Sequence, residues 1–283
     1  MFYSLLFSLL LQPLPFAHVG AGAKAQGGAL KLTNARITVG ELGPTRPSAK
    51  VLPGDVLFIS YDINGLTIED DGVAKYKMSM EVINSEGKAI FKQDPRDLAD
   101  FFPLRGNSIP ARAFITIGLD QDPGAYTCKL TVEDPKTKAT DTLTQKFEVG
   151  KREFGIVAVY TTYDERGAIS ASTTGTAGQT IFIHFSVATF ERDPKTKQPN
   201  VEFEFQILDE SGKPTLPKPR KHTQDSKALQ QVAENAGAFA MLFPLAMSRP
   251  GKFTVKITAT DNTEKGAGKK AVYELPVTVL PAN

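Results

Sequence analysis

The sequence has no tryptophan and only one cysteine, Cys128, among its 283 residues. A lone cysteine excludes an internal disulfide framework, so each domain must be held together by the packing of its core. With so few histidines and cysteines, a structural zinc site is excluded as well. Acidic and basic residues nearly balance at a formal net charge of +2 and the basic ones are scattered, so we expect no nucleic-acid-binding surface.

Motifs of familiar catalytic machinery are also missing. The chain contains no Gly-x-Ser-x-Gly elbow, no phosphate-binding P-loop and no His-Glu-x-x-His pair. We therefore expect a protein that is not an enzyme and uses no cofactor. The candidate that would contradict this expectation is the carboxylate pair Asp120 and Asp122, which has the chemistry for general acid–base catalysis.

The N-terminus predicts a secretory signal peptide over residues 1–25. Residues 2–11 are apolar apart from two serines, prolines end the run, and residues 23–25 (Ala-Lys-Ala) fit the small-x-small cleavage pattern. The run is shorter than the roughly 20 apolar residues that a transmembrane helix needs. We expect cleavage near Ala25 and a secreted or periplasmic protein without a membrane span, with an uncleaved anchor as the alternative.

What the chain does contain is a duplication. Three segments recur in the same order at nearly one spacing, between 124 and 127 residues. They are 54–63 with 178–187, 76–88 with 201–213, and 123–134 with 250–261. A fixed period of this length indicates a repeated domain. We predict domain 1 over residues 26–150 and domain 2 over residues 151–283, joined by a short linker.

Both copies alternate apolar and polar residues with period two, which is typical of strands with one buried face. Leu57 and Tyr61 share one face in the first copy, and Ile181 and Phe185 stand at the matching positions of the second. Seven strands separated by turn residues predict an antiparallel β-sandwich in each copy. The expected strands are 30–39, 55–63, 75–83, 89–93, 112–119, 125–133 and 140–149, then 153–162, 179–188, 201–208, 214–217, 238–246, 252–260 and 270–279.

Two segments depart from this pattern. Residues 226–235, in a loop found only in the second copy, carry the only plausible helical spacing of apolar residues. Residues 154–160 are apolar on both faces of their predicted strand. Val157 and Val159 therefore need a second cover, which either domain 1 or a partner would supply.

The spacing of Gly124, Tyr126 and Cys128 resembles the strand-F signature of the immunoglobulin fold, in which the tyrosine forms a corner and the cysteine pairs across the sheets. The second copy carries Gly251 and Phe253 at these places. The run is also similar to strand F of bacterial Ig-like and PKD-like extracellular modules. The first copy lacks a cysteine mate and the chain lacks the core tryptophan, so the resemblance implies two tandem seven-stranded Ig-like sandwiches rather than true immunoglobulin domains.

As a whole, residues 30–280 resemble duplicated secreted bacterial proteins of unknown function, which implies export and no reaction. The stretches 94–111 and 217–237 break the repeat, and loops on a rigid sandwich often carry function. They contain the candidate partner-binding residues Phe101, Phe102, Leu104, Arg105, Lys218, Arg220, Lys221 and His222. The alternatives are a first loop packed over the end of its own sandwich and a second loop that is simply solvated.

These observations predict a non-enzymatic binding or scaffolding protein of the cell envelope or extracellular space. It would contact a protein partner through these loops or by strand addition at a free sheet edge. One alternative is a periplasmic two-sandwich chaperone, with Arg36, Lys151 and Arg152 in its interdomain cleft. Another is an adhesion module that binds glycans through Tyr160 and Tyr163, or calcium at the domain joint through Asp164 and Glu165.

Overall fold

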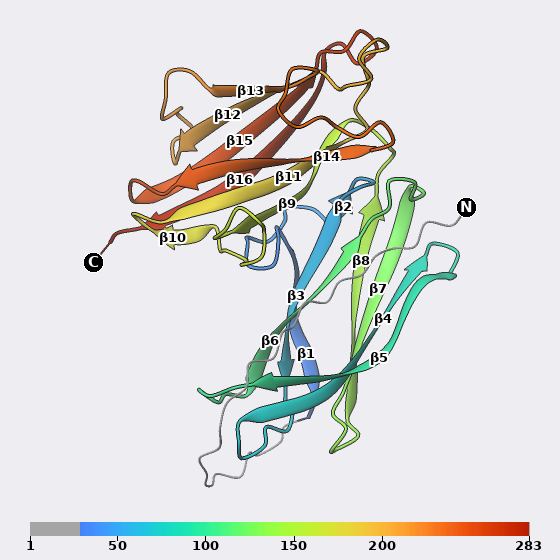
Figure 1. Cartoon of the computed structure of the whole chain (residues 1–283). Coiled ribbons are helices and arrows are strands. Elements are labelled where there is room, and N and C mark those ends of the chain that lie inside the picture. The colour runs from blue at the N-terminus through green and yellow to red at the C-terminus, as the bar shows by residue number, and fades with distance from the viewer. Residues whose placement is uncertain (1–28, 283) are drawn as a thin grey trace.

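The computed structural model describes residues 29–282, which form sixteen β-strands and no helix (Figure 1). The signal peptide predicted over residues 1–25 lies outside this range. Within it, no helix is long and apolar enough to span a membrane. The strands form four sheets, which pair into two sandwiches, and the strands of the second sandwich run across those of the first in Figure 1. The prediction of two tandem Ig-like β-sandwiches is confirmed, with eight strands in each instead of the expected seven, because each contains one further strand of only two or three residues.

Domain 1 packs a three-stranded sheet, in the order β1-β3-β6, against a five-stranded sheet, in the order β2-β8-β7-β4-β5. Its strands are β1 (Lys31–Thr38), β2 (Lys50–Val51), β3 (Val56–Asn64), β4 (Val73–Asn84), β5 (Ala89–Phe101), β6 (Ser108–Thr116), β7 (Gly124–Glu133) and β8 (Thr140–Val149). The short β2 pairs with β8 in parallel, and the other pairings are antiparallel. One side of the sandwich therefore ends in the edge strands β5 and β6, neither of which pairs with a further strand within residues 29–282.

Domain 2 repeats this arrangement, with sheet orders β14-β11-β9 and β10-β16-β15-β12-β13. Its strands are β9 (Gly155–Thr162), β10 (Thr174–Thr176), β11 (Thr180–Ala188), β12 (Val201–Asp209), β13 (Arg220–Gln224), β14 (Ala238–Ala246), β15 (Gly251–Asp261) and β16 (Lys269–Leu280). The matching order of the strands agrees with the duplication found in the sequence. The edge strands that correspond to β5 and β6 are β13 and β14.

Several strand positions differ from the sequence-based expectation. The strand expected at 112–119 lies at Ser108–Thr116, and the strand expected at 89–93 continues to Phe101. The strand expected at 214–217 is wrong: β13 begins only at Arg220, after prolines 214, 217 and 219. Proline lacks the N–H that a continuous ladder needs, so this stretch makes a single bridge and no strand.

The helix expected over residues 226–235 is also wrong. The side-chain amide of Gln198 donates to the carbonyl of Val232 at 3.1 Å and accepts from the N–H of Val232 at 2.9 Å. Both main-chain groups of Val232 are thereby taken by a partner outside the segment, so they are not available for helical hydrogen bonds. Val232 is buried in the core of domain 2.

The strand with two apolar faces, β9, is covered in two different ways. Ala158 lies in the left-handed region at φ 51°, where the register between β9 and β11 shifts. This bulge turns Val159 into the core of domain 2. Val157 instead faces domain 1 and packs close to Gly54. A Cβ atom added to Gly54 would lie 3.7 Å from the Val157 side chain. Domain 1 therefore supplies the second cover, for Val157 alone.

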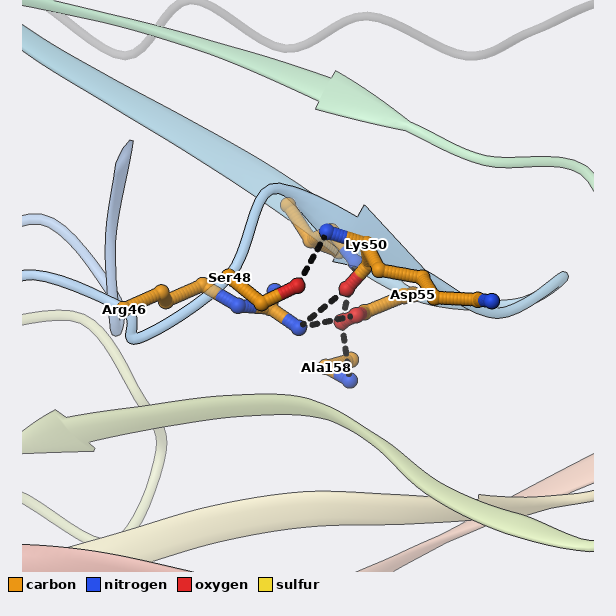
Figure 2. Close-up of polar contacts among 6 residues, drawn as sticks. Arg46, Ser48, Lys50, Asp55 and Ala158 are labelled. Carbon is orange, nitrogen blue, oxygen red and sulfur yellow. Dashed lines mark hydrogen bonds and ion pairs between the residues drawn. The ribbon is translucent and has the colours of Figure 1, made fainter. Parts of the chain in front are cut away.

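A buried ion pair of domain 1, between Arg46 and Asp55, contacts domain 2 at the same place (Figure 2). The Asp55 carboxylate accepts a hydrogen bond from the Arg46 guanidinium at 2.8 Å and another from the backbone N–H of Ala158, also at 2.8 Å. Burial lowers the pKa of Arg46, but the charge of Asp55, its hydrogen bond and Tyr273 together outweigh this effect, and the pKa ends above its usual value. Ala158 belongs to β9 of domain 2. The carboxylate of Asp55, in domain 1, therefore holds this bulge across the domain joint.

Candidate functional site

Domain 1 has a groove at the side where β5 and β6 are the edge strands. It has a volume of about 250 Å³ and is lined from β3, β4, β5 and β6. Residues 110–114 all line it, so the groove wraps around the edge of β6. Phe101 and Phe102 line it from the end of β5, which lies beside β6 in Figure 1. The groove is open to solvent, and its lining mixes apolar side chains with the charged Glu41, Asp100 and Arg112.

Two buried tyrosines form part of the groove wall. The Tyr76 hydroxyl donates to the Asp100 carboxylate at 2.6 Å, and the Tyr61 hydroxyl contacts the sulfur of Met78 at 3.0 Å. Burial raises the pKa of Tyr76, and the bond to Asp100 raises it further. Both phenols therefore stay protonated and uncharged, and they act as fixed hydrogen-bond donors rather than as acids.

The rim of the groove is connected to the domain joint. Arg112 of β6 donates to the Glu41 carboxylate at 2.9 Å, and the hydroxyl of Ser170, in domain 2, donates to the same oxygen at 2.9 Å. Glu41 and Arg112 both line the groove. The orientation of domain 2 therefore helps to fix the position of the Arg112 side chain at the groove edge.

The two copies differ at this groove, and the strand register shows why. Ile59 of β3 pairs with Ala113, whereas the corresponding Ile183 of β11 pairs with Phe243. By the same register, Ala111 corresponds to Met241. Small residues in domain 1 thus leave open the space that large side chains occupy in domain 2. Phe243 stacks on Phe205 there, with ring centroids 4.5 Å apart.

Domain 2 also closes its opening with a loop. Residues 225–237 follow β13 and place Val232 in the core, as described above. Arg192 holds this loop by donating to the carbonyls of Ala233 at 2.7 Å and Ala236 at 2.8 Å. In domain 1 the corresponding loop after β5 packs only Phe102 partly against the core, and Leu104 on it is 96% exposed.

The first group of predicted binding residues lies at the groove and beside it. Phe101 is the last residue of β5 and 53% exposed, and Phe102 packs partly against the core of domain 1. Leu104 is exposed, and Arg105 is exposed with its guanidinium on the carbonyl of Asp70 at 3.0 Å. The structure thus brings Phe101 and Phe102 to one apolar site, with Leu104 and Arg105 on the following loop.

The second group of predicted residues is placed differently from the expectation. Arg220, Lys221 and His222 belong to the edge strand β13 rather than to an irregular loop, and only Lys218 precedes it. Lys221 pairs with Glu204 at 2.7 Å and with Glu202 at 3.0 Å. These residues are more than 100 positions away in sequence from Phe101, and none of them lines the groove of domain 1.

The motif residues of strand F have the expected structural role. The Tyr126 hydroxyl donates to the carbonyl of Asp122 at 2.7 Å, which is the geometry of a tyrosine corner. Gly124 and Gly251 both have positive φ, at 150° and 142°. Phe253 lacks the hydroxyl, and the guanidinium of Arg249 lies over its ring at 5.3 Å.

Replacing Tyr126 with phenylalanine is expected to lower the free energy of unfolding by about 1 kcal/mol, because it removes the bond donated to Asp122 and the one accepted from Gln121. Urea denaturation followed by circular dichroism measures this. The matched control is Tyr163→Phe, at an exposed tyrosine, with an expected change within about 0.5 kcal/mol. Equal effects of the two substitutions would contradict the corner's contribution.

The remaining candidates from the sequence do not form a common site in the described residues. Cys128 is buried, and burial raises the pKa of its thiol to about 12. Asp120 and Asp122 are exposed. Tyr160 stacks on His184 at 4.7 Å, which covers one face of its ring. The Asp164 carboxylate accepts three backbone N–H groups, and residues 29–282 contain no group of three possible metal ligands.

Sequence reasoning missed three functional or structural residues. Ala111 and Ala113 open the groove, but an alanine in a strand carries no signal unless its counterpart is known. Asp55 follows a turn glycine, and the second copy has Gln179 at its place. Only that difference between the copies marks Asp55 as a residue with a role in domain 1 alone.

No family model and no curated protein matches this chain. Among solved structures, it is similar to the C-terminal domain of the antigen I/II polypeptide BspA of Streptococcus agalactiae, with a TM-score of 0.30, 11% identity and coverage of 88% of this chain and 100% of that one. It is also similar to the C-terminal domain of the antigen I/II-family protein AspA of Streptococcus pyogenes, with a TM-score of 0.28, 11% identity and coverage of 89% of this chain and 100% of that one. For red sea bream transglutaminase the TM-score is 0.27 and the identity 9%. The match covers 89% of this chain, which spans only 31% of that protein.

Proposed function

We propose that this chain is a non-enzymatic, exported binding module, and that a protein partner docks in the groove between β5 and β6 of domain 1. The observation that carries the proposal is the contrast between the two copies. Domain 2 fills this opening with Met241, Phe243 and a loop of its own, while domain 1 leaves about 250 Å³ open between its edge strands β5 and β6. An open site on a surface that exposes large apolar side chains such as Phe101 favours association with another molecule.

The chemistry of the groove supports binding rather than catalysis. Its tyrosines are held protonated, and its polar groups are occupied by one another: Tyr76 with Asp100, and Arg112 with Glu41. The proposed export rests on the apolar run and the cleavage pattern of residues 2–25. The partner is expected outside the cytoplasm, in the envelope or the medium.

The test is site-specific photo-crosslinking in the cells that produce the protein. A photoreactive phenylalanine analogue replaces Leu104, on the loop beside the groove, or Leu229, which is equally exposed on the corresponding loop of domain 2. We expect a defined protein adduct from position 104 and none from position 229. Adducts of the same proteins from both positions, or none from position 104, would refute docking at domain 1.

A further inference from the structure

We propose that domain 2 has a binding site of its own, where β14 ends and β15 begins, and that this site takes a small aromatic carboxylate. The site is a pocket of about 260 Å³ between the two sheets of domain 2, which we call the domain 2 pocket. Residues 245–249 line one side of it, and β12, β15, β16 and Thr215 line the rest. The inference goes beyond the proposed function and does not depend on the groove of domain 1.

The two copies differ at this end of the sandwich as well. By the pairing of the last two strands of each domain, Phe253 corresponds to Tyr126. Its cross-strand partner Val277 corresponds to Phe147. In domain 1 the rings of Tyr126 and Phe147 stack with centroids 5.5 Å apart, and the space left there is only about 10 Å³. The domain 2 pocket is therefore open where an aromatic ring fills the first copy.

The hairpin after β12 contributes to the opening. The turns 84–88 and 209–213 are closed by the same backbone hydrogen bonds, so Thr215 stands where domain 1 has Ile90. Ile90 lines the filled space of domain 1, and Thr215 lines the domain 2 pocket. The next side chain, that of Leu216, is 60% exposed and does not line the pocket. A smaller side chain and one turned to solvent thus leave this wall open.

The only charged side chain that lines the domain 2 pocket is that of Arg249. Its guanidinium lies over the Phe253 ring, 5.3 Å from the centroid, and it forms no ion pair within residues 29–282. Hydrogen bonds from Ser211 and Lys213, together with the charge of Arg249, lower the pKa of Asp209, whose carboxylate is thereby already occupied. A guanidinium held flat on a ring presents a fork of N–H groups that matches a carboxylate.

The size of the pocket limits the ligand to a single ring with a short chain. Its volume lies just below the roughly 300–1,000 Å³ of pockets that bind drug-sized molecules. Aromatic rings pair in offset or tilted arrangements with centroids roughly 4.5–7 Å apart, as Tyr126 and Phe147 do. A ligand ring in the place of Phe147 would pair with Phe253 in the same way. A carboxylate on a short chain would then reach Arg249.

Fluorine NMR titration of the purified protein tests this chemistry. The probe is para-fluorophenylpropionate, and the matched probe para-fluorophenylpropanol has an alcohol in place of the carboxylate. Saturable binding of the propionate is expected, at least about tenfold tighter than that of the alcohol, because the alcohol forms no charge-assisted bond with the guanidinium. As unlabelled competitors, phenylpropionate should displace the probe more effectively than cyclohexylpropionate, which has the same charge without an aromatic ring.

Two variants test the ring space and the charge separately. Val277→Phe restores the ring of domain 1 and fills the pocket, so probe affinity should fall at least about tenfold. Its matched control is Val272→Phe, at a position of the same strand that is 54% exposed, which should leave affinity unchanged. Arg249→Gln should abolish the preference for the carboxylate over the alcohol, whereas Arg166→Gln, at an exposed arginine outside the pocket, should preserve it. Because Arg249 is exposed, its variant decides the matter if Val277→Phe fails to fold.

Each result supports or overturns the proposal. Unchanged affinity in the Val277→Phe variant, or a carboxylate preference that survives Arg249→Gln, overturns it. Absence of saturable binding up to about 10 mM probe overturns it as well. If a peptide that ends in phenylalanine binds at least about tenfold tighter than phenylpropionate, a small-molecule ligand is overturned in favour of the end of a partner chain. None of these results affects crosslinking at Leu104 in domain 1, so the proposed function is tested separately.

Discussion

Replacing Asp55 with alanine is expected to lower the free energy of unfolding by about 3–5 kcal/mol, as removal of one partner of a buried ion pair does. The side chain of Asp55 is 6% exposed and that of Arg46 is 14% exposed. The substitution leaves the Arg46 guanidinium without its counterion and the N–H of Ala158 without an acceptor. Urea denaturation followed by circular dichroism measures the loss.

Further variants locate the origin of that loss. Asp55→Asn keeps an acceptor for Ala158 but removes the charge and the bond from Arg46, so it should cost less than alanine. The double variant Arg46→Met with Asp55→Ala should cost less than the sum of the two single changes, because no unpaired charge remains. The exposed pair Lys50 and Glu148 is the matched control, with a cost within about 0.5 kcal/mol. A cost below about 1 kcal/mol for Asp55→Ala would contradict the joint described above.

The joint connects stability to the candidate site. Asp55 holds the bulge of β9, and domain 2 in turn reaches the groove rim through Ser170, which shares the Glu41 carboxylate with Arg112. Tyr273 of β16 also lies near the ion pair: burial raises its pKa to about 12, Arg46 opposes this and Asp55 adds to it. A domain that moved freely would carry Ser170 away from Glu41 and loosen the rim. The ion pair therefore supports the geometry of the groove.

Much of the fold was predictable because it depends on local patterns that both copies carry. The period-two alternation around Leu57 and Ile181, and the turn glycines at the ends of strands, predict most of the strands and their sheets. Local patterns failed where a distant group decided the structure. The backbone of Val232 is captured by Gln198, which is 34 residues away, so helical spacing within the loop had no influence.

The groove could not be predicted from the sequence because it depends on register. The expected strands 112–119 and 238–246 align Arg112 with Ala238, whereas hydrogen bonds to β3 and β11 align Arg112 with Leu242. The loops before these strands differ in length between the copies, and neither length is visible in the alternation. Without the correct register, Ala113 and Phe243 are not recognised as counterparts, and the open space between the sheets has no trace in the sequence.

The comparison of the two copies also predicts the effect of removing a large side chain from the matching place in domain 2. Phe243→Ala is expected to lower the free energy of unfolding by about 2–4 kcal/mol, because it removes a half-buried ring that stacks on Phe205 and leaves a cavity. The neighbouring Leu242→Ala, on the outer face of β14, should cost less than about 1 kcal/mol. Thermal and urea denaturation of both variants measure the difference.

This result also tests why domain 1 has a groove at all. Phe205 corresponds to Met80 in domain 1 and Phe243 to Ala113, so the first copy forgoes the ring stacking that these two phenylalanines make in the second. If the ring stabilises domain 2 by several kcal/mol, domain 1 gives up stability to keep the space open, and binding is the reason that the structure offers. If Phe243→Ala costs no more than Leu242→Ala, the large side chains contribute little, and the two alanines of domain 1 need no functional explanation.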